Sequence, residues 1–218
     1  MADFRAERQD VLDAVRRIVA AGLVSAASGN VSRRIRETDR DLVAVTASRV
    51  PYHRFTIDDV LVVDMDVEPV FGDRIPSSES LCHTAAYRAR ADVGAVIHTH
   101  SLYASAFAVA GRAIPAILDE QVVLLGGPVE VAEYGAAASE DLAEKAVASL
   151  GERAAVLLRN HGVLGVGADL EEAVAVVELV ERVARICILS EAIGGAVELA
   201  AEIVHDEQQV YRMMKGFR

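Results

Sequence analysis

Short segments rich in β-branched residues alternate with longer segments of helical apolar periodicity along the whole sequence, and this alternation limits the possible folds. The apolar runs expected to be buried strands are 42–46, 61–66, 94–100 and 154–159. Helix-length segments separate most of these runs. Interleaved strands and helices of this kind predict an α/β or α+β fold in which helices cover a central sheet.

Apolar spacing and turn residues give approximate limits for the other elements. Helices are predicted over about 11–22, from Ser77 or Ser78 to about Arg90, and over 101–111, 139–150, 170–193 and 206–218. Further strands are predicted from about Asn30, at 68–72 pairing with 61–66, at 122–125, at 129–134, and at 161–167. The sequence leaves the strand order open.

Length, charge and cysteine content exclude several classes of protein. The 218 residues contain no long linker or repeat, so residues 1–218 are expected to form a single domain. A formal net charge of −11 disfavours nucleic acid or an anionic membrane as a partner. No apolar run approaches the ~20 residues of a membrane helix, and charges close to the N-terminus argue against a signal peptide. With Cys82 and Cys187 as the only cysteines, a reducing cytoplasm is expected.

Three of the six histidines lie in a pattern typical of a metal site. His98 and His100 are two positions apart at the end of a predicted strand, so both side chains point to the same face. His161 lies in a predicted turn between two strands. Three neutral imidazoles with one open position form the ligand set of a catalytic zinc site. The alternative is that the pattern is a coincidence and that all these histidines are structural, as we interpret His53, His83 and His205.

Glu79 is the carboxylate best placed to act beside such a metal ion. Ser77 or Ser78 is expected to cap the following helix, which would place Glu79 in its first turn. A carboxylate there is also favoured by the helix dipole alone, so a purely structural role remains an alternative.

Taken together, these blocks resemble the class II aldolase/adducin family over nearly the whole chain. The blocks that carry the resemblance are Gly29-Asn30-Val31-Ser32, residues 46–52, Pro76-Ser77-Ser78-Glu79, His98-Thr99-His100, Ile114-Pro115-Ala116-Ile117 and His161-Gly162. The resemblance implies a three-layer αβα sandwich with a largely antiparallel sheet, assembled as a homotetramer.

The same resemblance assigns roles to individual residues. It implies one divalent ion per chain, normally Zn²⁺ with Mn²⁺, Co²⁺ or Mg²⁺ as alternatives, held by His98, His100 and His161. Glu79 would be the catalytic acid/base. A substrate phosphate would be bound by Gly29, Asn30, Ser48, Ser77 and Ser78. Backbone N–H groups and hydroxyls in such loops suit an anion.

The chain departs from the family pattern in two places. Ser48-Arg49 stands where the family's aldolases have Thr-Gly, and the Arg49 guanidinium suits a phosphate or a carboxylate or narrows the pocket. The family's tyrosine proton donor, supplied by a neighbouring subunit, is replaced by Asp119 and Glu120. Either a carboxylate or a bound water takes over this role, or the substrate differs.

The resemblance implies a metal-dependent carbon–carbon lyase of carbohydrate metabolism. It would cleave a small, phosphorylated sugar or sugar acid through an enediolate whose charge the ion stabilises. A sugar-phosphate epimerase, a dehydratase or a decarboxylase of the same family is an alternative. Glu79 favours the aldolase branch, because the epimerases have aspartate there, while the missing tyrosine argues the other way. A non-catalytic, adducin-head-like interaction module is a further alternative, but such heads lack the histidine ligands.

Overall fold

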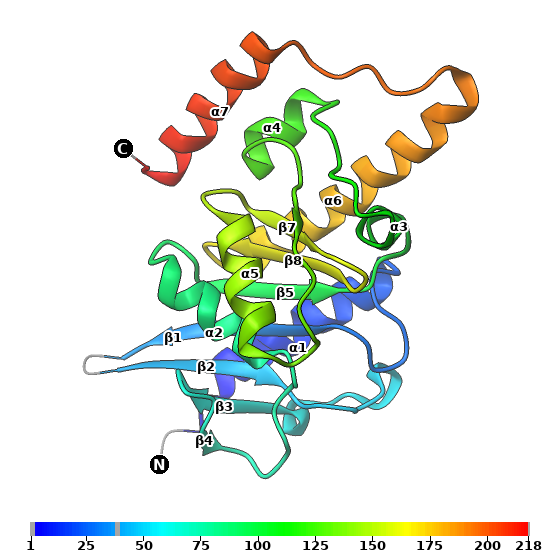
Figure 1. The fold of residues 1–218 in the computed structure, drawn as a ribbon. Coiled ribbons are helices and arrows are strands. Elements are labelled where there is room, and N and C mark those ends of the chain that lie inside the picture. Colours follow the sequence, from blue (N-terminus) through cyan, green and yellow to red (C-terminus); the bar gives the residue numbers. More distant parts are fainter. Residues whose placement is uncertain (1–2, 38–39, 218) are drawn as a thin grey trace.

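An eight-stranded sheet forms the centre of the computed structural model, which describes residues 3–37 and 40–217 (Figure 1). Its strand order is β4-β3-β2-β1-β5-β8-β7-β6, and every neighbouring pair is antiparallel except β6 and β7. The strands are β1 (Asn30–Arg36), β2 (Asp41–Thr46), β3 (Val60–Asp64), β4 (Pro69–Phe71), β5 (Ala95–Thr99), β6 (Val131–Ala132), β7 (Ala155–Leu158) and β8 (Gly162–Gly167). The expected largely antiparallel sheet is confirmed.

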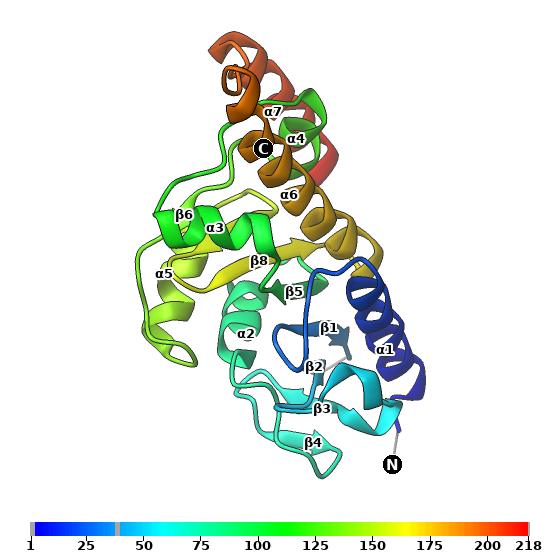
Figure 2. The same ribbon diagram turned by 90° about the vertical axis from the view of Figure 1, so that its right-hand side faces the viewer.

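Helices cover both faces of this sheet and produce three layers (Figure 2). One face is covered by α1 (Arg5–Ala20), α3 (Leu102–Ala110) and α6 (Leu170–Ser190). The other is covered by α2 (Ser80–Ala89) and α5 (Glu140–Leu150). Two further helices, α4 (Asp119–Leu125) and α7 (Ala201–Lys215), pack on each other beyond the β7 end of the sheet (Figure 1). The αβα sandwich implied by the family resemblance is therefore confirmed.

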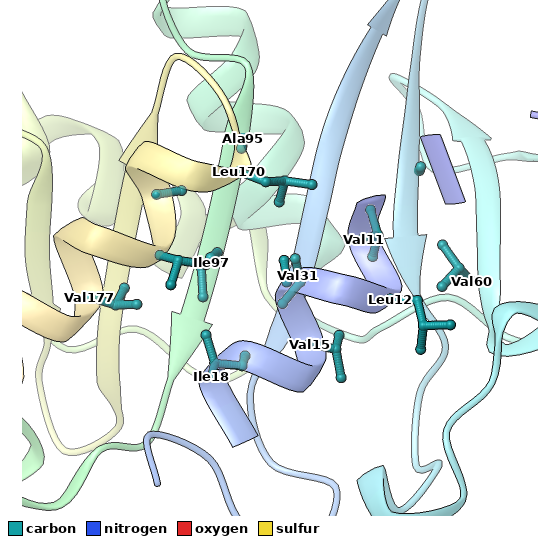
Figure 3. Close-up of a cluster of buried hydrophobic side chains, with 14 of the residues drawn as sticks. Val11, Leu12, Val15, Ile18, Val31, Val60, Ala95, Ile97, Leu170 and Val177 are labelled. Carbon is teal, nitrogen blue, oxygen red and sulfur yellow. The ribbon is translucent and has the colours of Figure 1, made fainter. Parts of the chain in front are cut away.

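The hydrophobic core under α1 and α6 shows why this sequence forms these layers (Figure 3). Val11, Val15 and Ile18 recur on one side of α1 and are at most 2% exposed. They pack with Val31 of β1 and Ile97 of β5, which point to the same face of the sheet. Burying each such side chain stabilises the fold by about 1.5–3 kcal/mol.

Strand alternation directs polar residues to the opposite face. Because Val31 and Ile97 point toward α1 and α6, Asn30 and His98 point toward α2. The Cα atoms of Asn30 and His98 are direct partners in the β1–β5 register. Polar residues at the ends of two central strands therefore meet beside the start of α2.

The predicted strand at 122–125 is wrong, because these residues belong to helix α4. Val122 and Leu125 are three positions apart and are buried between α4 and its neighbours, which is a helical arrangement. Gly126 ends the helix with a φ of 84°. Of the strand predicted at 129–134, only Val131–Ala132 forms a ladder, parallel to β7.

The start of α2 also differs from expectation. Ser77 donates its backbone N–H to the Thr46 carbonyl of β2 at 3.0 Å, and its own carbonyl accepts from the Ser80 N–H at 3.1 Å and from the Ser80 hydroxyl at 2.7 Å, so residues 77–80 form a turn before the helix. It begins at Ser80, with Glu79 as the residue before the first helical position. The Glu79 side chain makes no capping hydrogen bond and is free for other contacts. The last helix starts at Ala201, earlier than the predicted 206, and α6 ends at Ser190, before a short 3₁₀ turn over Glu191–Ile193.

Within the described residues, none of the helices combines the length and apolar character required for a membrane span.

Candidate active site

Three histidine side chains converge at one edge of the central strands. His98 lies in β5 and His100 directly follows the strand, while His161 lies in the turn between β7 and β8. Their ring centroids are 4.7–4.9 Å apart in all three pairs. One nitrogen of each ring lies within 4.8 Å of the others, so together they could hold a metal ion.

A backbone contact fixes which nitrogen of His98 faces the centre of this cluster. Its Nδ1 atom lies 2.9 Å from the carbonyl oxygen of Val163 in β8. A carbonyl only accepts hydrogen bonds, so Nδ1 carries the proton and Nε2 keeps its lone pair. That Nε2 atom lies 2.8 Å from Nε2 of His100. The unprotonated Nε2 atom of His98 therefore points toward the second imidazole and can act as a metal ligand.

The surroundings keep these imidazoles neutral. Burial lowers the pKa of His98 well below its usual value, and the nearby His161 and His100 lower it further. Burial likewise lowers the pKa of His100 and of His161. Neutral imidazole is the form that binds metal ions. The three side chains therefore fit a divalent ion as ligands.

Glu79 faces the same site from the start of α2. It is 6% exposed, and its Oε1 atom accepts a hydrogen bond from the Ala138 backbone N–H at 3.1 Å. The Cys82 thiol lies 3.8 Å from the other carboxyl oxygen. Burial raises the pKa of Glu79, while the Ala138 hydrogen bond and the nearby His100 side chain oppose this shift. A buried carboxyl group with a raised pKa is suited to a role as a general acid or base.

One cavity of about 280 Å³ brings the histidines, Glu79 and the predicted anion-binding residues together. Its lining includes Gly29, Asn30, Ser48, Arg49, Ser77, Ser78, Glu79, His98, His100 and His161. These residues come from five separate parts of the chain.

Two glycines allow the strands to approach closely enough to form the site. A Cβ atom at Gly162 would lie 2.3 Å from the Thr99 carbonyl oxygen and 3.2 Å from the His98 ring. A Cβ atom at Gly29 would lie 2.6 Å from the His98 carbonyl oxygen, and Gly29 also has a φ of 78°. The Tyr52 hydroxyl donates to the Gly29 carbonyl at 2.7 Å and holds this loop.

Arg49 lines the cavity in an uncommon backbone conformation. Its φ is 60°, in the left-handed region that favours glycine. The side chain is exposed and forms no ion pair within residues 3–37 and 40–217. A strained residue with a free guanidinium at a cavity wall suggests a functional constraint.

Asp119 and Glu120 do not line this cavity in the same chain. Both lie in the first turn of α4, where Glu120 pairs with Arg182 and Asp119 lies beside Glu207.

The sequence analysis missed two contributors to the site. The Ala138 N–H, which contacts Glu79, belongs to the small-residue segment before α5, and Ala138 has a φ of 64°. The run Gly135-Ala136-Ala137-Ala138 was the available signal, since small residues allow close approach. Cys82 follows Glu79 by three positions, which places the two side chains on one helix face.

A buried carboxyl group beside three neutral imidazoles defines a metal-dependent enzyme with acid/base chemistry. The comparisons identify its family: residues 9–188 match the Class II Aldolase and Adducin N-terminal domain, and the chain belongs to this family. It is a metal-dependent aldolase, a carbon–carbon lyase, as the sequence analysis predicted.

Individual relatives support this assignment. The chain is 33% identical to 5-deoxy-D-ribulose 1-phosphate aldolase of Bacillus thuringiensis over 189 residues, which is 86% of this chain and 87% of the relative. It is 34% identical to an L-ribulose-5-phosphate 4-epimerase of Salmonella paratyphi B over 200 residues, with 87% of each covered. A solved L-fuculose 1-phosphate aldolase is similar with a TM-score of 0.88 and 32% identity, over 95% of this chain and 96% of that one.

Proposed function

We propose that this protein cleaves a small ketose 1-phosphate by a reversible aldol reaction, with residues 1–218 acting as one domain. The observation that carries the proposal is the shared cavity, in which Glu79 faces His98, His100 and His161. Two of the relatives described above are named as aldolases of sugar 1-phosphates, which supports this class of substrate.

The histidine triad is the proposed metal site. Three neutral imidazoles favour Zn²⁺, with Mn²⁺, Co²⁺ and Mg²⁺ as alternatives. When bound, a divalent ion there supplies Lewis-acid stabilisation of the negative charge that develops beside the substrate carbonyl. The protein contributes the fixed donor geometry, through the His98–Val163 contact.

Glu79 is the proposed acid/base. Burial raises its pKa, which favours proton transfer, and we assign it the exchange of a proton with the substrate carbon next to the carbonyl. The Ala138 N–H holds one carboxyl oxygen, which limits the orientations of the group. Asp119 or Glu120 of a neighbouring subunit, or a water that it positions, is the proposed substitute for the family's tyrosine donor.

The small polar residues of the cavity lining are the proposed phosphate site. Gly29, Asn30, Ser48, Ser77 and Ser78 present small polar groups there, and Arg49 adds a positive charge. A guanidinium forms two parallel hydrogen bonds to a phosphate or a carboxylate. We therefore expect L-fuculose 1-phosphate to be a poor substrate and a more acidic or differently shaped relative to be better.

The test is a direct assay of the metal-loaded protein with L-fuculose 1-phosphate, 5-deoxy-D-ribulose 1-phosphate and related sugar acids. Appearance of a three-carbon phosphate and an aldehyde is the expected result. Loss of these products after chelation and their return with Zn²⁺ would support the metal site. The contrary result is efficient cleavage of L-fuculose 1-phosphate that does not change in Asp119→Asn, Glu120→Gln and Arg49→Gly variants. It would show that these three residues take no part in the reaction.

Epimerisation is the second candidate, favoured by the 34% identical epimerase and by the missing tyrosine. L-ribulose 5-phosphate distinguishes the two: an epimerase returns an isomer with the same number of carbon atoms, whereas an aldolase returns two fragments. Conversion to an isomer without fragments would replace the aldolase proposal.

The assembly and the compartment are also proposals. Exposed apolar side chains, including Ile193 at 89% and Val197 at 86%, support a homotetramer. Light scattering should give about four times the chain mass of 23.3 kDa, and a monomer mass would contradict this assembly.

Two free, buried cysteines support a cytoplasmic location, which cell fractionation tests.

A further inference from the structure

His83 is a buried histidine that belongs neither to the metal cluster nor to the cavity lining. It lies on α2 one helical turn after Glu79 and is 0% exposed. Its Nδ1 atom lies 2.7 Å from the Ser32 hydroxyl oxygen of β1. The Tyr87 hydroxyl, one further turn along α2, lies 2.7 Å from the same oxygen. Three polar side chains thus form a continuous chain inside the α2–β1 interface.

The direction of this chain follows from counting protons. A phenol is a stronger hydrogen-bond donor than an alkyl hydroxyl, so in their contact the Tyr87 hydroxyl donates to the Ser32 oxygen. Ser32 then donates its single proton to His83 Nδ1. Burial lowers the pKa of His83 to about 3, so the ring is neutral and carries one proton. With Nδ1 as the acceptor, that proton is on Nε2.

Two buried polar atoms in this layer have no hydrogen-bond partner among the described residues. One is Nε2 of His83, a donor in this arrangement, and the other is Oδ1 of Asn30, an acceptor. Asn30 and Ser32 are two positions apart on β1 and therefore lie on the same face of the strand. Asn30 also lines the cavity together with Glu79, the residue one turn before His83. A buried donor and a buried acceptor, each without a partner in the described part of the chain, thus belong to the same layer between α2 and β1.

We propose that His83 is a positioning residue that orients the Asn30 amide through its Nε2–H group. The two atoms do not hydrogen-bond to each other, so the Nε2–H donates to one buried water, which in turn donates to Asn30 Oδ1. The Asn30 NH₂ group is then turned toward the cavity. This inference rests on the proposed function, because it assigns that NH₂ group to the substrate phosphate.

The orientation of the amide decides whether Asn30 attracts or repels an anion. The two ends of an asparagine amide have nearly the same shape, but one donates hydrogen bonds and the other accepts them. An amide turned the other way would aim an oxygen at the phosphate. His83 disfavours this alternative, because the water that accepts from its Nε2–H has protons left to donate, and only the oxygen of the amide can accept one of them.

The first test is ¹⁵N NMR of the wild-type protein, which reports the tautomer of the buried His83 ring. The expected result is a proton on Nε2 and a bare Nδ1 at neutral pH. A proton on Nδ1 would overturn the inference, whatever the enzymatic activity. This measurement needs no variant and no substrate.

The second test compares His83→Gln with His83→Phe in the metal-loaded protein. Glutamine can accept from Ser32 and donate toward Asn30, whereas phenylalanine fills space but does neither. We expect His83→Phe to bind inorganic phosphate about tenfold more weakly and to raise KM more than it lowers kcat. His83→Gln should stay within about threefold of wild type by the same reasoning, and both should keep stoichiometric metal.

His205→Phe on the exposed face of α7 is the matched control and should leave phosphate binding unchanged. Phosphate affinity of His83→Phe equal to that of wild type would overturn the inference. A wild-type protein that binds phosphate but cleaves no sugar phosphate would overturn the proposed function instead, and the effect of His83→Phe would still be measurable.

Discussion

The backbone N–H of Ala138 donates to Oε1 of Glu79 at 3.1 Å, although 59 positions separate the two residues. The segment before α5 therefore sets the orientation of a carboxyl group that the start of α2 supplies. Ala138 adopts a φ of 64° to make this contact, a conformation that is costly for a residue with a Cβ atom. The proposed acid/base is thus held by tertiary structure and not by its own helix.

Glu79→Gln should keep metal and substrate binding but lower turnover by about 100-fold or more. The amide oxygen can still accept from the Ala138 N–H, so the shape is preserved while the proton carrier is lost. Steady-state rates and metal analysis on the same preparation check this. Glu144→Gln, on the exposed side of α5, is the control. Turnover within about threefold of wild type would leave Glu79 with a structural role only.

His98→Ala should lose most of its metal affinity, because one of three imidazole donors is removed. The measurement is metal content after dialysis against a mild chelator. His53→Ala, an exposed histidine outside the cluster, should retain the metal. Stoichiometric metal in His98→Ala would show that the triad is assigned incorrectly.

Arg49→Gly should change stability and binding in opposite directions. Glycine removes the strain of a φ near 60° and should stabilise the fold by about 1 kcal/mol. Loss of the guanidinium should weaken binding of a sugar phosphate about tenfold. Urea unfolding and KM provide the two readouts, and Arg49→Lys, which keeps both the charge and the strain, is the comparison. A variant that is neither more stable nor weaker in binding would contradict both arguments.

Gly162→Ala should lose metal binding and also destabilise the fold. The added methyl group would lie 2.3 Å from the Thr99 carbonyl oxygen, so β8 must move away from β5 and carry His161 with it. Overpacking of this kind costs about 1–3 kcal/mol. Gly22→Ala is a control for metal binding, since no atom lies within 4 Å of its added Cβ, but its φ of 72° makes alanine costly for stability there as well. Unchanged metal affinity in Gly162→Ala would mean that the strands adjust without displacing the histidines.

The metal-free protein should lose stability as pH falls from about 6.5 toward 3, partly because of His83. Its pKa is about 3 when folded and about 6.5 when unfolded, so between these values only the unfolded chain binds the proton. Each such group makes the unfolding free energy fall by about 1.4 kcal/mol per pH unit. Urea unfolding from pH 7 to 4 should therefore show a shallower slope in His83→Gln. Equal slopes would mean that His83 titrates normally.

Local patterns were sufficient for much of this fold and for part of the site. His98 and His100 could be paired from sequence because side chains two positions apart on a strand share a face. The apolar period of α6 likewise gave its extent to within three residues.

Tertiary contacts explain what local patterns could not give. Residues 122–125 have the composition of a strand. They form a helix because Val122 and Leu125 are then buried against neighbouring helices. The start of α2 is displaced because residues 77–80 form a turn, in which Ser80 donates to the Ser77 carbonyl. The Ala138 N–H was missed because the small residues around it indicate a close approach of the backbone but not which group it approaches.

The placement of the three histidines has a mechanical consequence for the whole sheet. His100 follows β5, His161 precedes β8, and roughly 60 residues of chain lie between them. An ion held by both would act as a reversible cross-link that closes this long loop, much as a disulfide would, and would restrict the unfolded chain. The melting temperature should therefore rise with the concentration of free metal, so that thermal denaturation becomes a measure of metal occupancy that requires no substrate.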